Sequence, residues 1–206
     1  ESPYKKPDLK LLKFFNNFKD FGQNLKVLYS LFISLTLLIM FISMYSILNS
    51  YITSNKVGGD MSVASVVKLF GVIGMFLSLL AGRLCGRLGT KRVLTLALST
   101  CVVSLILMGT FTNIVLITIF SVTFVAGIAF AIPTVISKVG VVVNSNQGFF
   151  LSVNTVILFL GTAIAPILMI YVKQIPNFFL EFLTIAMIGV LAVIVSIFMP
   201  NDHHVN

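Results

Sequence analysis

Six long stretches of the chain consist almost entirely of hydrophobic residues, and short polar segments separate them. An α-helix needs about 20 mostly apolar residues to cross the hydrocarbon core of a bilayer. The pattern therefore predicts an all-α membrane protein with six transmembrane helices. These helices are expected at residues 27–51, 61–81, 93–108, 114–136, 149–171 and 178–199.

The longest polar segment lies at the start of the chain. Apolar side chains recur there at helical spacing, at Leu11, Phe14, Phe15, Phe18 and Phe21. This periodicity predicts an amphipathic helix in the membrane interface, which serves either as a plain linker or as a contact for lipids or a partner. The predicted division is a cytoplasmic linker at residues 1–24, a helical bundle at residues 25–200 and a tail at residues 201–206.

The overall composition excludes a soluble globular protein. Hydrophobic residues make up 58% of the chain and charged residues only 10%, against about 25% charged residues in soluble domains. The net charge of +8 raises the question of nucleic-acid binding. The cations, however, lie in short polar segments and form no basic patch with interleaved aromatics, so we expect no nucleic-acid partner.

The positions of the cations instead predict how the chain is oriented. If the six helices are spans, eleven of the 14 Lys and Arg residues fall on one side of the membrane. Only Lys56 and Lys173 fall on the other side, and Lys68 lies within a span. Because cytoplasmic loops are enriched in Lys and Arg, the pattern predicts a multi-pass protein of the cytoplasmic membrane with both ends of this chain inside the cell.

A basic segment at residues 82–92 contains three glycines and four cations. Each cation would cost about 2.5–3.5 kcal/mol at the centre of a bilayer. The segment is therefore predicted to be a tight loop at the membrane surface between the second and third helices.

The same segment resembles the signature loop of the major facilitator superfamily, Gly-x-x-x-Asp-Arg-x-Gly-x-Lys/Arg-Lys/Arg. The matching residues are Gly82, Arg87, Gly89, Lys91 and Arg92, and Gly86 stands at the acidic position. The resemblance implies that the six transmembrane helices form one half, the C-terminal half, of an MFS-type twelve-helix transporter. It also implies a partner outside this chain, the missing N-terminal six-helix half.

Resemblance to drug exporters of this superfamily adds a function. The run from Gly161 to Pro166 is similar to the Gly-x-x-x-Gly-Pro core of their antiporter motif, with Ala165 in place of a glycine. It implies efflux of a small amphipathic substrate by alternating access, coupled to protons or another ion. In that case the first and fourth helices supply most of the cavity-facing residues, and the proton-carrying carboxylate lies in the other half.

Lys68 is the main candidate for the substrate site, because an ionisable group at membrane depth is by default a functional candidate. It either attracts an anionic group or extends towards the headgroups. Tyr45, Asn49 and Asn154 are further polar candidates within apolar helices, and Asn154 serves equally well as an interhelical contact. Glu181 is expected to face water near the outer end of the last helix, with pairing to Lys68 left open.

Three further features bear on packing and bending. Gly71, Gly74, Ser78 and Gly82 follow one another at steps of three and four, which predicts close packing of the second helix. The stripe containing Phe41 and Tyr45, beside Met40 and Met44, either lines a cavity, faces lipid or packs against other helices. Pro133 predicts a bend in the fourth helix, either static or used in gating.

No catalytic constellation is evident, so the chain is predicted not to be an enzyme and to need no cofactor. His203 and His204 lack further ligands, and no metal site is expected. Two alternatives to drug efflux stay open: a transporter of sugars or other metabolites, and a non-transport six-helix membrane scaffold or channel subunit.

Overall fold

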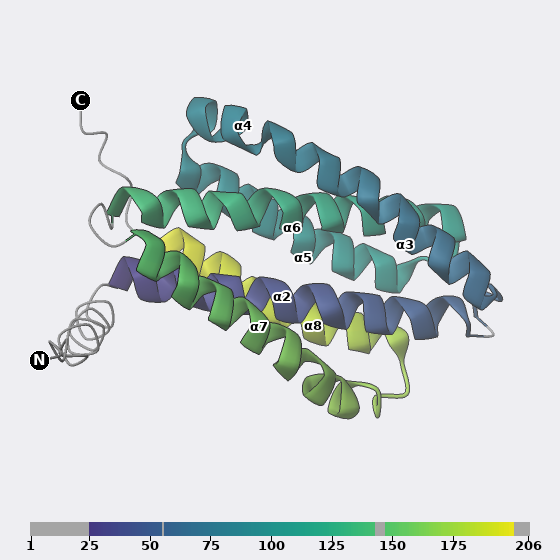
Figure 1. Ribbon diagram of the computed structural model, residues 1–206. Coiled ribbons are helices and arrows are strands. Elements are labelled where there is room, and N and C mark those ends of the chain that lie inside the picture. Colours follow the sequence, from purple (N-terminus) through teal and green to yellow (C-terminus); the bar gives the residue numbers. More distant parts are fainter. Residues whose placement is uncertain (1–24, 55, 143–146, 200–206) are drawn as a thin grey trace, which may run out of the picture.

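The computed structural model describes residues 25–54, 56–142 and 147–199, which form a bundle of long helices (Figure 1). The expected amphipathic helix at residues 1–24 and the tail at residues 201–206 lie outside the described residues. The elements in chain order are α2 (Leu25–Ile52), α3 (Met61–Phe76), the 3₁₀ turn η1 (Leu77–Leu80), α4 (Ala81–Leu88), α5 (Thr90–Thr110), α6 (Ile114–Val142), α7 (Gln147–Val172) and α8 (Phe178–Phe198).

Five of these helices, α2 and α5 to α8, are each long and apolar enough to cross a membrane. The sixth crossing consists of two consecutive elements, α3 and η1. Helix α3 is a shorter apolar helix of 16 residues, and η1 continues it directly for four residues. Together they rise about 32 Å, close to the thickness of a bilayer core of about 30 Å. The chain therefore crosses the bundle six times, as the sequence predicts.

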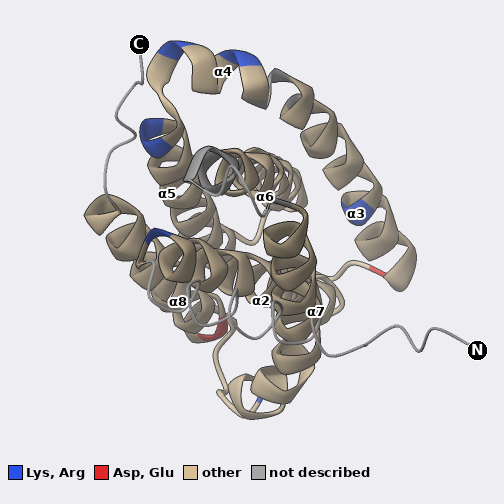
Figure 2. Ribbon diagram, turned by 60° about the vertical axis from the view of Figure 1, so that its left-hand side comes forward, with Lys and Arg blue, Asp and Glu red and all other residues tan. Residues whose placement is uncertain are grey.

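Helix α2 occupies the centre of the bundle. It packs against α3, α6, α7 and α8, while α5 lies against α6 and α8. Helices α3 and α7 flank α2 on the side away from α5 (Figure 2). The start of α2, the end of α8, α4 and the start of α5 all lie at one end of the bundle (Figure 1).

Glycines allow the backbones to approach closely at several crossings. A Cβ on Gly74 would stand 2.7 Å from the Val122 carbonyl oxygen of α6, and one on Gly161 would stand 2.8 Å from the Leu35 carbonyl oxygen of α2. Gly71 and Gly74 thus confirm the predicted packing stripe of the second span. Gly82 departs from it, because it is exposed and has no neighbour within 4 Å of its Cβ position.

The prediction of a tight loop at residues 82–92 is wrong. Helix α4 continues to Leu88, and only Gly89 separates it from α5. Leu and Arg favour helix, and a helical glycine costs only about 1 kcal/mol. The helix therefore continues through Gly82 and Gly86. The break falls at Gly89, whose φ of 82° and ψ of 145° lie in a region essentially confined to glycine.

The helices on either side of the connection between the expected spans at residues 114–136 and 149–171 are also longer than expected. Helix α6 continues to Val142 and α7 begins at Gln147. Polar residues there mark where the chain leaves the apolar layer, and a helix can continue past that point because its backbone groups bond internally.

Candidate functional site

A cavity of about 460 Å³ lies between α2, the α3–η1 column and α6. It is lined almost entirely by apolar side chains. The lining residues are Leu38, Phe41, Met75, Ser78, Val125, Ile128, Ala129, Ile132 and Pro133. Most of them belong to α2 and α6, the first and fourth spans. Met40 and Met44 are fully buried in the core instead, so within that region of α2 Phe41 lines the cavity and the methionines pack.

A polar pair lies further along the seam between α2 and α3. The Lys68 ammonium on α3 donates a hydrogen bond to Asn49 Oδ1 on α2 at 3.1 Å. Asn49 Nδ2 in turn contacts Met61 Sδ at 3.9 Å. Lys68 is half-buried, and it forms no ion pair with any residue that the structure describes. Among the described residues, the Lys68 ammonium therefore has a neutral amide as its hydrogen-bond partner and no carboxylate.

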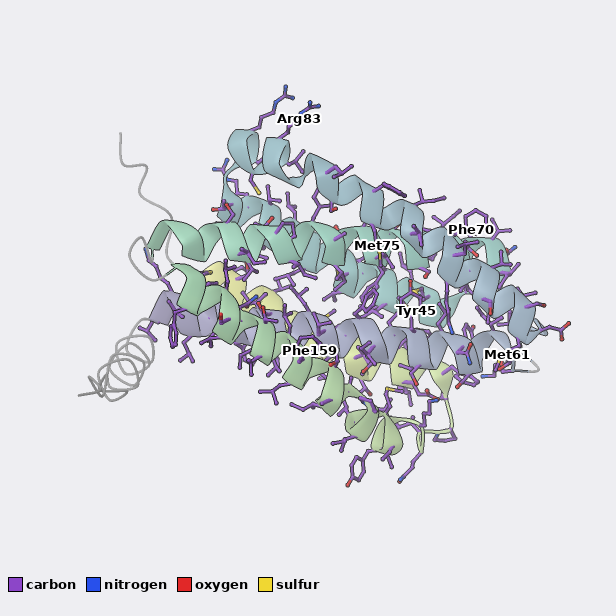
Figure 3. All side chains as sticks on the ribbon, in the orientation of Figure 1. Tyr45, Met61, Phe70, Met75, Arg83 and Phe159 are labelled. Carbon is purple, nitrogen blue, oxygen red and sulfur yellow. The ribbon has the colours of Figure 1, made fainter. Side chains whose placement is uncertain are left out.

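Tyr45 lies between this pair and the cavity along α2. It lies one turn before Asn49 on α2, and its ring meets the Phe41 ring edge-on with centroids 5.1 Å apart. Its hydroxyl lies against Gly71 of α3, at 2.5 Å from where a Cβ would stand. Figure 3 shows Tyr45 and Met75 between the helices, whereas Arg83 points away from the bundle. Glycine at position 71 thus makes room for the Tyr45 hydroxyl on α3.

The structure therefore brings together three of the four predicted site residues: Tyr45, Asn49 and Lys68. None of the three lines the apolar cavity. They place hydrogen-bond donors on α2 and α3, within about two helical turns of its lining residues Phe41 and Met75. Such a combination of apolar walls and few polar groups is typical of sites for small molecules.

Asn154 lies elsewhere. It is on α7, which packs against α2 with Phe150 near Val27 and with Gly161 at Leu35. At 1.5 Å per residue this places Asn154 about 20 Å from Tyr45 along α2. Asn154 is only 2% exposed, and its Oδ1 has no hydrogen-bond partner among the described residues. It is not part of the polar seam between α2 and α3.

The signature residues gather at one end of the bundle. Arg87 is on α4, and Lys91 and Arg92 are in the first turn of α5 on the other side of Gly89. Figure 2 shows basic residues on α4 and at the start of α5. Cys85 Sγ of α4 lies 3.4 Å from Thr134 Oγ1 of α6, which attaches α4 to the bundle beside a second cavity of about 420 Å³.

Two features differ from the sequence-based expectations or escape them. Glu181 is only 4% exposed and does not face water as expected, and its Oε2 has no partner among the described residues. It forms no ion pair with Lys68, which bonds Asn49 instead. Met75, Ile128 and Ile132 line the cavity and were not predicted from the sequence. Every face of these helices is apolar, so the hydrophobic pattern cannot distinguish residues that face the cavity from residues that face lipid.

Taken together, the fold and the site define a multi-pass helical membrane protein with a cavity between its helices. Residues 13–206 match the sequence profile of the Major Facilitator Superfamily, and the chain belongs to this superfamily of transporters. A search among curated proteins gave no match.

A solved structure supports the same fold. The crystal structure of a mutant of the peptide transporter POT in complex with alafosfalin superposes with a TM-score of 0.73 at 20% identity. The match covers 83% of this chain and 37% of that transporter, so the chain spans little more than a third of its length. The fold is therefore that of one six-helix half of an MFS-type transporter.

Proposed function

We propose that this chain is the C-terminal half of a secondary active transporter that carries a small amphipathic molecule across the cytoplasmic membrane by alternating access. The observation that carries the proposal is the cavity between α2, α3 and α6, which has apolar walls. The bond between Lys68 and Asn49 lies further along α2 and α3. A sugar carrier needs many polar groups along its path, and this lining offers few. An amphipathic substrate therefore fits better than a sugar.

The partner of this half is a second six-helix half. The exposed apolar surface of the bundle is compatible with this, because every long helix exposes large apolar side chains, among them Leu69 and Phe76 on α3 and Phe159 and Ile170 on α7. Lipid covers some of this surface and the other half covers the rest. The coupling ion is proposed to be the proton, with efflux as the direction, on the resemblance to drug exporters.

Transport is tested with the full-length protein reconstituted in liposomes. The probes are radiolabelled octanesulfonate, octyltrimethylammonium and glucose, and an imposed pH gradient is compared with one collapsed by a protonophore. Flux of either octyl probe that depends on the gradient, with none of glucose, supports the proposal. Flux of glucose alone would favour a sugar carrier. Absence of flux for all three would contradict transport of amphipathic molecules.

A matched pair of variants tests whether flux passes through the cavity. Met75→Trp places a larger side chain in the cavity wall, and we expect it to reduce flux strongly. Phe76→Trp changes the next residue, which is 67% exposed and does not line the cavity, and should leave flux near the wild-type rate. Equal effects of the two substitutions would place the pathway elsewhere.

The orientation is tested by labelling engineered cysteines in intact cells. Lys56 and Arg83 lie at opposite ends of the bundle, and both are exposed. With the basic end inside the cell, Lys56→Cys reacts with an impermeant maleimide added outside, and Arg83→Cys reacts only after the cells are opened. The reverse pattern would overturn the cytoplasmic assignment of the basic end.

A further inference from the structure

We propose that the seam formed by Lys68, Asn49 and Tyr45 binds the acidic group of an amphipathic organic anion, whose apolar part lies in the cavity beside Phe41 and Met75. The anion is of the class that includes carboxylates, sulfonates and phosphate monoesters, which share charged oxygen acceptors. This inference rests on the proposed transport function and specifies the class of its substrate.

The first argument is the balance of donors and acceptors in the seam. An ammonium group carries three donors and no acceptor, and Asn49 Oδ1 takes only one of the three from Lys68. The Tyr45 hydroxyl makes no hydrogen bond to the described part of the chain. Asn49 Nδ2 has only the weak contact with Met61 Sδ at 3.9 Å. The seam therefore offers several donors, and an anion would accept from them.

The second argument is charge. Lys68 is half-buried in an apolar helix, and no described carboxylate neutralises it. Asp60, before the start of α3, is exposed and forms no ion pair with it. A cation in the substrate would meet repulsion at this seam, whereas an anion would form charge-assisted hydrogen bonds, the strongest kind.

The third argument is the spacing of the polar and apolar parts. Lys68 and Met75 are seven residues apart on α3, which is about 10 Å along the helix, and Asn49 and Phe41 are eight residues apart on α2, about 12 Å. Tyr45 lies halfway and contacts the Phe41 ring. A molecule with its acidic group at Lys68 and an apolar body about 10 Å long would therefore span the distance to the cavity. It would pass the Tyr45 side chain, whose hydroxyl lies against Gly71 between the two.

The test measures binding to the purified full-length protein in detergent, independently of flux. The probes are octanesulfonate and octyltrimethylammonium, which have the same chain length and permanent charges of opposite sign. Wild-type protein should bind the sulfonate more tightly. Lys68→Met should weaken sulfonate binding about 10–100-fold, because a hydrogen bond between charged groups is lost. Lys68→Arg keeps the charge and should retain most of the affinity.

Lys56→Met is the matched control. It removes the same charge at the same end of the bundle, but Lys56 is exposed and lies outside the seam, so sulfonate affinity should stay within about twofold of wild type. Equal losses in Lys56→Met and Lys68→Met would point to a general electrostatic attraction and overturn the site.

A chain-length series tests the apolar half of the proposal. Affinity should rise by up to about fourfold for each methylene from hexanesulfonate to decanesulfonate, until the cavity is filled. Met75→Trp should flatten this series while Phe76→Trp leaves it intact. This arm uses the wild-type seam, so it stays decisive even if Lys68→Met fails to fold.

The outcomes separate this inference from transport itself. Unchanged sulfonate binding in folded Lys68→Met, or tighter binding of octyltrimethylammonium to wild type, would overturn the anion site, while flux driven by a pH gradient would still support transport. Sulfonate binding that depends on Lys68 without any flux would support the site and contradict the transport function.

Discussion

The packing of α3 on α6 makes a sharp prediction about Gly74. A Cβ at this position would stand 2.7 Å from the Val122 carbonyl oxygen and 3.0 Å from the Ala126 amide nitrogen. Ordinary van der Waals contact begins at 3.4 Å, so the first distance is 0.7 Å too short. Both neighbours are backbone atoms of α6 and cannot turn aside as a side chain would. Gly74→Ala must therefore push α3 away from α6.

Two opposing effects determine how much Gly74→Ala changes the free energy of unfolding. Overpacking a close contact costs about 1–3 kcal/mol, while replacing glycine by alanine inside a helix returns about 0.5–1 kcal/mol. We expect a net loss of about 1–2 kcal/mol in the free energy of unfolding for Gly74→Ala. Gly82→Ala is the control, because Gly82 is helical and has no neighbour within 4 Å. At position 82 only the higher helix propensity of alanine acts, and the free energy of unfolding should rise by about 0.5–1 kcal/mol.

The assay is unfolding of the full-length protein in one detergent, followed by heating or by titration with a denaturing detergent. The same chemical change is expected to shift the midpoint down at position 74 and up at position 82. Refutation would come from a Gly74→Ala protein as stable as wild type, because α3 would then not lie on α6 at the observed separation. A loss of equal size at Gly82 would point to a general intolerance of alanine.

Two further predictions use the same unfolding assay. Tyr51→Phe removes the hydrogen bond from the Tyr51 hydroxyl to the Phe111 carbonyl oxygen at 3.0 Å, and should cost about 1 kcal/mol; no change would mean that water or lipid replaces this bond. Gly89→Ala places a Cβ at a φ of 82° and a ψ of 145°, a region essentially confined to glycine, and should cost about 1–3 kcal/mol. Gly89→Asn should cost about as much, because Asn tolerates positive φ mainly near the αL values of ψ, about 30–60°. Stability equal to wild type in either variant would show that the turn relaxes.

Hydrophobic length predicted the long helices well. The expected spans at residues 27–51 and 178–199 agree closely with α2 and α8, because in a bilayer the backbone must satisfy its own hydrogen bonds and apolar length then sets the helix. The ends at the membrane surface were harder. Arg83 and Arg87 mark the surface, yet the helix that carries them continues to Leu88. Charge locates the boundary of the apolar layer, and backbone geometry at Gly89 ends the helix.

The site could be predicted only in part. Lys68, Asn49 and Tyr45 were candidates because polar groups in apolar helices are costly. That Lys68 bonds Asn49 rather than Glu181 depends on the rotation of α3 and α8 about their axes. In a soluble protein, the difference in polarity between the buried and exposed faces of a helix indicates how the helix is rotated about its axis. This difference is weak in a membrane helix, where every face is apolar.

The bond between Lys68 and Asn49 also admits a purely structural interpretation, in which it only satisfies two polar groups. The energies involved argue against this structural interpretation. A lysine within a span costs up to about 2.5–3.5 kcal/mol, and a hydrogen bond to a charged group returns about 1.5–3 kcal/mol. A neutral pair would satisfy the same groups without leaving a charge, whereas Lys68 keeps a full positive charge that no described carboxylate balances. An anionic ligand would balance it, and this difference gives binding at the seam an electrostatic driving force that a structural role does not require.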